Sequence, residues 1–274
     1  MGEISPFVAS VSTRIARHAA AYTAELDAAA HPGRMSLDSF AVHVEAVLDD
    51  YDPPSARRRH SDTLVFPHLY GAARDPSADE EGWRVPSAVL AGLMAAEVEF
   101  RGPLRLSARQ NTLLAEEYET IGAQLSAAGL ATHAALAFRR AMALYRVNED
   151  DEAEDRCGLE LARSSTRALP PGVRRWAGQG SYLLCGHGYR PSWLLGWVVL
   201  QMLLFTGVAL LLDSVQPPAD TIYMGVTGFL NPPGPGDTRD LHGAVRVLFV
   251  IEAWTGAVSM SVFFALLVRK WFRM

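Results

Sequence analysis

The chain has few cysteines and lacks the sequence signatures of the common enzymes. Its two cysteines, Cys157 and Cys185, show no Cys-x-x-Cys spacing in 274 residues, so neither a disulfide framework nor a zinc ribbon is indicated. There is no G-x-S-x-G motif, no Walker loop and no H-E-x-x-H motif, and the eight histidines are scattered along the chain. We therefore expect no enzyme, no metal site and no cofactor.

Charge is also scarce. Only 20% of the residues are charged, and the formal net charge is -5, whereas a nucleic-acid binder needs a strongly basic domain or face. Hydrophobic residues make up 49% of the chain, and the mean hydropathy is +0.07, so the chain is too apolar to be disordered. The apolar residues gather in the last third, which predicts a soluble part followed by a membrane part.

Two long apolar runs occupy that last third. The first, Trp193–Leu212, has 20 residues and no charge, and the second, Val247–Val268, has 22 residues with Glu252 as its only charge. A helix rises about 1.5 Å per residue, so each run can cross the hydrocarbon core of a bilayer, which is about 30 Å thick. We expect two transmembrane helices in a multi-pass protein of the cell membrane.

Basic residues predict the orientation of these spans. They lie just before the first span and just after the second, whereas the connector between the spans is mainly acidic. Basic residues favour the cytoplasmic side, so both termini are expected there. The N-terminal residues lack the apolar core of a signal peptide. The basic residues are Arg174, Arg175, Arg190, Arg269, Lys270 and Arg273.

The connector between the spans has an unusual order of segments. The run Ala219–Leu230 fits a short apolar helix, and the sequence NPPGPGD at Asn231–Asp237 must end it. Non-helical backbone at membrane depth persists only where protein buries it or where it lines a water-filled path. A short helix, a Gly-rich segment and an acid therefore predict a re-entrant pore loop over residues 219–237.

This order resembles the pore of two-transmembrane potassium channels. In addition, CGHGYRP at Cys185–Pro191 is similar to the segment before the first span in prokaryotic two-span ion channel proteins with a cytoplasmic N-terminal domain. The resemblance covers about residues 183–274 and implies a homotetramer that conducts monovalent cations through a central path. It assigns the filter to Pro232, Pro233, Gly234, Pro235, Gly236 and Asp237.

The filter departs from the potassium signature Thr-Val-Gly-Tyr-Gly-Asp. The Thr hydroxyl and the Tyr ring are missing, and a residue before proline is pushed away from the α region. The resemblance therefore implies a cation channel whose selectivity stays open, with K⁺ among the alternatives. A non-conducting loop is the remaining alternative.

Two residues of the second span are candidate functional residues. Glu252 would cost about 2.5–3.5 kcal/mol if it faced lipid, so it should face protein or a water-filled cavity. It could brace the filter, attract cations or pack against a neighbouring helix. Gly256, one turn later, could be a hinge or could allow close helix contact.

The first 182 residues predict a helical cytoplasmic domain, followed by a pore module at 183–274. Helical periodicity covers Phe7–Ala30 and Leu37–Leu48, whereas Val98–Leu106 alternates like a short strand or hairpin. Residues 118–146 fit a helical hairpin with a turn at Gly129, which resembles a tetratricopeptide repeat. The fold class is mainly α.

A second function fits the same sequence. The helical domain could bind a cytoplasmic protein partner while the two spans only anchor it and the loop conducts nothing. The two hypotheses differ in oligomeric state, because one subunit supplies only a quarter of a tetrameric filter.

Overall fold

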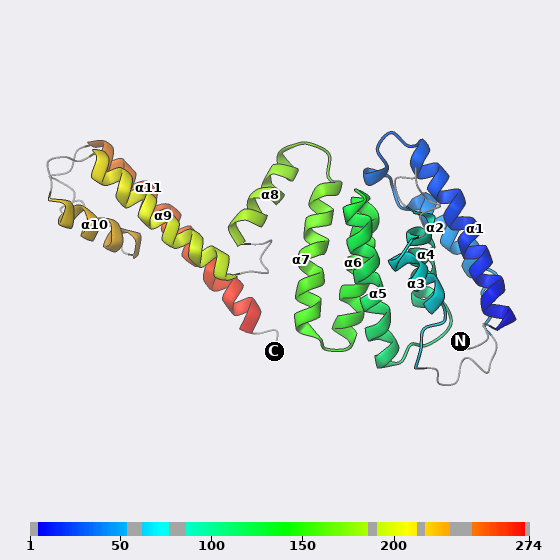
Figure 1. The fold of residues 1–274 in the computed structure, drawn as a ribbon. Coiled ribbons are helices and arrows are strands. Elements are labelled where there is room, and N and C mark those ends of the chain that lie inside the picture. The colour runs from blue at the N-terminus through cyan, green and yellow to red at the C-terminus, as the bar shows by residue number, and fades with distance from the viewer. Residues whose placement is uncertain are drawn as a thin grey trace. The chain divides into compact units, whose positions relative to one another are not determined.

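The computed structural model describes residues 5–53, 62–76, 86–185, 191–212, 217–230 and 243–271. These residues form helices and no strand (Figure 1), so the mainly α fold class is confirmed. Contacts divide the chain into two compact units, Met1–Gly178 and Gln179–Met274, which we describe separately. The boundary expected between residues 182 and 183 stays a prediction.

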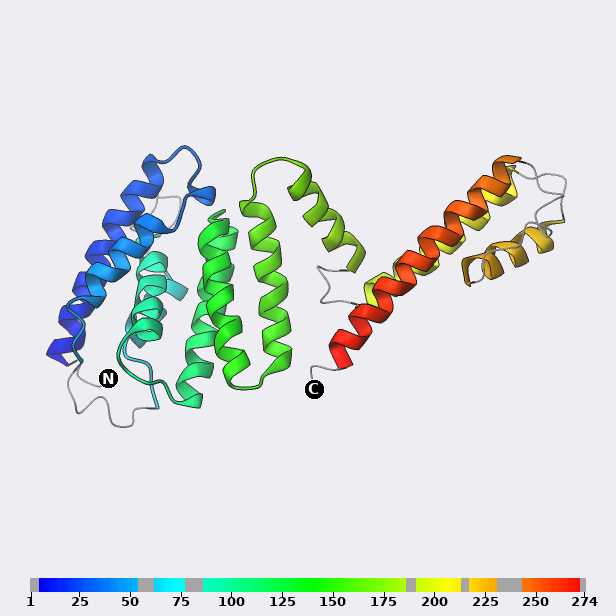
Figure 2. The ribbon, with the colours of Figure 1, turned by 180° about the vertical axis from the view of Figure 1, so that it is seen from behind.

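The first unit is a set of helices that lie side by side (Figures 1 and 2). Helices α5, α6 and α7 pack in chain order, and α4 packs against α1, α3 and α5. Helix α8 begins in this unit. The elements are α1 (Pro6–Ala28), the 3-10 helix η1 (Pro32–Arg34), α2 (Asp38–Leu48), α3 (Pro67–Arg74), α4 (Ser87–Arg101), α5 (Ala108–Ala127), α6 (Ala131–Val147), α7 (Asp151–Ala168) and α8 (Val173–Cys185).

The α5–α6 hairpin forms where the sequence predicts it. Gly129 adopts φ +81° at the turn, a conformation that glycine reaches without steric cost. Gly122 of α5 lies against α6, where a Cβ atom would be 3.1 Å from the ring of Phe138. A small residue opposite an aromatic ring therefore lets the two helices approach closely. The likeness to a tetratricopeptide repeat stays a prediction.

The strand expected at Val98–Leu106 is wrong, because its first four residues belong to α4. The alternation misled because Glu97 and Glu99 are buried, at 2% and 3% exposure, although their residue type is usually found at the surface. The helix ends at Arg101, just before Gly102 and Pro103. A core helix with buried acids therefore has no polar face that periodicity could detect.

Each buried acid of α4 is held by donors from other elements. Arg140 donates to both oxygens of Glu97, at 2.9 and 3.0 Å, and Tyr118 donates to the same carboxylate at 2.9 Å. Tyr70 donates to Glu99 at 3.0 Å. Paired donors offset the loss of hydration that burial of a carboxylate brings.

Removal of the cation from the Glu97 pair should destabilise the first unit. Arg140→Met leaves a buried carboxylate without its cation, so we expect the free energy of unfolding to fall by about 3–5 kcal/mol. Urea unfolding of the full chain in detergent, followed by circular dichroism, measures this loss. The control is Arg101→Met, which breaks the exposed pair with Glu45 and should cost about 0–1 kcal/mol. Equal losses in both variants would contradict the prediction.

Among its described residues, the second unit contains three helices beyond α8. They are α9 (Pro191–Leu212), α10 (Pro218–Leu230) and α11 (Gly243–Trp271). Helices α9 and α11 lie side by side, with α10 beside them (Figures 1 and 2). The two expected spans lie inside α9 and α11, and α11 extends beyond the expected span at both ends. Helix α10 forms where the short apolar helix is expected.

Candidate functional site

Helices α9 and α11 are long and apolar enough to cross a membrane. The qualifying stretches are Trp193–Leu212, with 20 residues, and Gly243–Val268, with 26 residues. Of the 18 most apolar consecutive residues in each stretch, only 22% are buried within the chain. Side chains such as Leu203 and Trp254 are 62% and 71% exposed. Most of this apolar surface therefore needs lipid or further protein to cover it.

Two contacts define how α9 and α11 pair. Ser259 donates a hydrogen bond of 3.4 Å to Gln201, so the polar side chain of the first span joins the two helices. Further along, Ala209 of α9 is buried in one cluster with Val245 and Phe249 of α11. Later residues of α9 therefore contact earlier residues of α11, which means that the two helices are antiparallel.

Helix α10 packs against both long helices. Its Gly225 lies so close to α9 that a Cβ atom would overlap the hydroxyl oxygen of Thr206. Its Met224 packs against the cluster that includes Val245 and Phe249 of α11. Thr221 lies one turn before Met224 and Gly225, so a single stripe of α10 faces the pair.

Glu252 is fully buried inside this unit, at 0% exposure. It shares a stripe of α11 with Val245 and Phe249, and the antiparallel pairing places it at about the level of Thr206. Neither carboxylate oxygen has a hydrogen-bond partner among the described residues, and neither do the hydroxyls of Thr206 and Thr221. The three helices thus bury polar side chains that have no partner in the described part of the chain.

Gly256 lies one turn after Glu252 and is also buried. Helix α11 continues through Gly256 without interruption. The expected filter residues Pro232, Pro233, Gly234, Pro235, Gly236 and Asp237 lie outside the described residues. The side chains of the Cys185–Pro191 segment likewise lie outside the described part of the chain.

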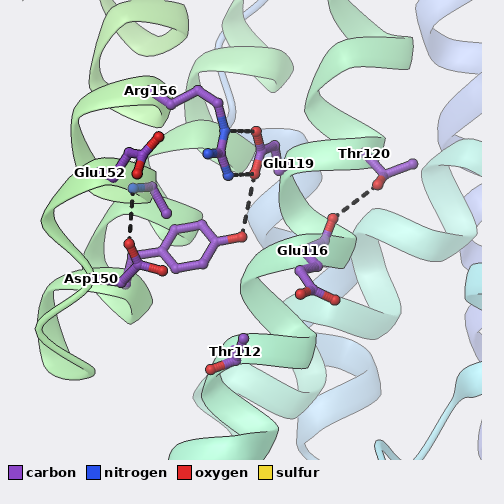
Figure 3. A pocket seen from close by; sticks show the side chains of 9 residues that line it. Thr112, Glu116, Glu119, Thr120, Asp150, Glu152 and Arg156 are labelled. Atoms are coloured by element: carbon purple, nitrogen blue, oxygen red, sulfur yellow. Dashed lines mark hydrogen bonds and ion pairs between the residues drawn. The ribbon is translucent and has the colours of Figure 1, made fainter.

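The first unit contains a pocket of about 420 Å³ that the sequence analysis did not find (Figure 3). Helices α5, α6 and α7 form it, and four of its lining side chains are acidic. Its lining residues are Thr112, Glu116, Glu119, Thr120, Tyr145, Asp150, Glu152, Ala153 and Arg156. The charged run at residues 148–155 could have indicated this pocket, because it supplies two of the four acids.

The acids of this pocket differ in their partners. Arg156 donates to both oxygens of Glu119, at 2.7 and 3.0 Å, and Tyr145 also donates to this carboxylate. Asp150 accepts from the backbone N–H of Ala153 at 3.0 Å and so caps α7. Burial, followed by the charge of Glu119, raises the pKa of Tyr145, which keeps this hydroxyl a donor.

Neither a metal cluster nor a reactive thiol is found among the side chains that the structure describes. The residues described there contain no group of three or more His, Cys, Asp or Glu side chains placed to hold a metal. Burial raises the pKa of the Cys157 thiol to about 12, so this cysteine is a packing residue and not a reactive thiolate.

Comparisons with known proteins assign no family to the chain. No family model matches it, and neither a curated protein nor a solved structure matches it. The site must therefore be interpreted from its own residues.

The close approach of α10 to α9 gives a direct test of this packing. Gly225→Ala should lower the thermal unfolding temperature in detergent, because the new methyl group overlaps Thr206. Overpacking of this kind typically costs about 1–3 kcal/mol. Adding Thr206→Ala to Gly225→Ala should restore most of the loss, because it removes the overlapping hydroxyl. A double variant as unstable as the sum of the two single variants would show that α10 does not contact α9 here.

Proposed function

We propose that the chain is a subunit of a cation channel whose pore loop spans residues 219–237 and whose first unit regulates it from the cytoplasm. The observation that carries the proposal is a short helix, α10, packed against two helices of membrane-spanning length. The sequence directly after α10 is the Gly-rich, acid-terminated segment that we assign to the filter. Carbonyl oxygens of such a segment replace an ion's hydration shell.

The exposed apolar surface of α9 and α11 supports assembly. A single subunit supplies one copy of the loop, and a central path needs a ring of them, so the proposed assembly is a homotetramer in the lipid bilayer. Helix faces that α10 does not cover, with Val250 at 66% and Trp254 at 71% exposure, are available for neighbouring subunits and lipid. Both termini are then cytoplasmic, as the basic residues predict.

Flux through purified protein tests the proposal. Vesicles that contain the full chain should pass K⁺ or Na⁺, and Asp237→Lys should reduce the flux about tenfold, because four positive charges would surround the outer mouth. Asp151→Lys reverses a charge at the start of α7 and is the matched control with unchanged flux. Absence of flux above that of protein-free vesicles would contradict conduction.

Selectivity has its own test at the filter. The variant Pro235→Tyr restores the tyrosine of the potassium signature and returns a backbone N–H to the loop. If the loop is a filter, this variant should raise the K⁺ to Na⁺ permeability ratio, measured as a shift of the reversal potential. Pro217→Tyr, just before α10, is the control. An unchanged ratio in Pro235→Tyr would argue against a filter at this position.

The alternative function is a membrane-anchored adaptor that binds a cytoplasmic protein. The acidic pocket of α5, α6 and α7 favours it, because Glu116 and Glu152 line an open pocket that suits a basic side chain. The two functions predict different assemblies: a tetramer in mild detergent supports the channel, whereas a monomer or dimer without flux supports the adaptor.

A further inference from the structure

Helix α1 is held to three other helices by histidines. Its His18 lies against His43 of α2, with 3.0 Å between the two Nδ1 atoms. Its Ser12 is 2.8 Å from Nε2 of His68 on α3, and its Tyr22 is 2.7 Å from Nε2 of His133 on α6. Histidine is the side chain whose ordinary pKa falls in the physiological range. Each of these three contacts of α1 therefore includes a titratable side chain.

The His18–His43 contact tolerates only a limited number of protons. A hydrogen bond between two nitrogens needs one that carries a proton and one that does not. His43 has its other nitrogen, Nε2, 3.1 Å from Oε1 of Glu25, and a carboxylate only accepts, so this Nε2 is protonated. In the neutral pair, His18 donates from Nδ1 to His43. One added proton can be accommodated, because a singly protonated pair still offers one N–H donor and one acceptor nitrogen, but a second proton leaves two N–H groups facing each other.

The surroundings oppose that second proton. Burial, then His43, Arg14 and Arg17, lower the pKa of His18. Among the described residues, Glu25 is the one acid that contacts the pair, and it also accepts a hydrogen bond from Ser39. Two imidazolium ions would thus share a single carboxylate.

In the described part of the first unit, the acids on the packed helices already have other partners. On α4, the buried acids Glu97 and Glu99 are bound to Arg140 and Tyr70. On α2 and in the turn after it, Glu45 pairs with Arg101, and Asp50 pairs with Arg14. On α6, His133 contacts Tyr22, whose ring packs against His43. The second positive charge at the pair is therefore not neutralised.

The other two histidine contacts respond differently to acid. Ser12 donates its hydroxyl proton to the carbonyl oxygen of Val8 at 2.7 Å, so it accepts from Nε2–H of His68, and protonation of His68 leaves this bond intact. Burial lowers the pKa of His133 to about 4, so His133 stays neutral in mild acid. Between about pH 7 and pH 5, the responsive contact is therefore His18–His43.

We propose that the His18–His43 pair is an acid-sensitive latch, in which uptake of a second proton separates α2 from α1. The direction follows from linkage. Because the pKa of His18 is lower in the folded state, its contribution to stability is present above the unfolded value of about 6.5 and is lost as the pH falls below it. The latch is independent of ion conduction and operates in either proposed function.

Hydrogen exchange of the full chain in detergent tests the latch. Between about pH 7.5 and pH 5.5, protection of α1 and α2 amides, corrected for intrinsic exchange, should fall about tenfold relative to α5 and α6. His18→Asn places a non-titrating amide near the position of Nδ1 and should remove this pH dependence. His31→Asn, at the start of η1, is the control and should behave as the wild type.

A second variant should raise the pH at which the helices separate. Glu25→Gln removes the negative charge that contacts the pair, so protons on the closed pair are less favourable and the helices separate at a higher pH. This shift in the transition pH can be measured even if His18→Asn weakens the fold. Unchanged protection of wild-type α1 and α2 in acid, or a wild-type transition pH in both variants, would overturn the proposal.

Discussion

The packing of α10 against both α9 and α11 is the constraint on which the interpretation of the second unit depends. Helix α10 has 13 residues and is about 20 Å long at 1.5 Å per residue, so it cannot cross a hydrocarbon core of about 30 Å. If α9 and α11 span the bilayer, α10 is too short to be a third span, so the chain returns to the side from which α10 begins. Gly225 makes this packing possible, because any larger residue would meet Thr206.

The burial of Glu252 agrees with a module of three helices. A carboxylate that faced lipid from a bare hairpin would be costly, whereas here the unit covers it completely. It lies on the stripe of α11 that also carries Val245 and Phe249, which pack in one cluster with Ala209 of α9. Thr206 and Thr221 bring further polar atoms into the same unit, and such groups are favoured where helices meet in a membrane.

The sequence predicts best those features that depend on local periodicity. The two spans, the short helix α10 and the turn at Gly129 could all be read from apolar runs or glycine and proline positions. The strand predicted at Val98–Leu106 fails because Glu97 and Glu99 are paired by residues distant in the chain, and pairing of this kind leaves no local pattern. The acidic pocket and the histidine contacts of α1 likewise join residues from several helices, which one sequence cannot bring together.

The depth of α10 in the membrane is the most direct test of the pore-loop interpretation. Spin labels at Ile222→Cys and Tyr223→Cys, both exposed on α10, can be introduced into the full chain with Cys157 and Cys185 replaced by Ser and reconstituted in vesicles. Val147→Cys, exposed on α6, serves as the water-accessible reference. A re-entrant helix predicts frequent collisions with oxygen and few with a water-soluble nickel complex at both α10 sites. Nickel collision rates equal to those at residue 147 would place α10 in water and contradict a pore loop.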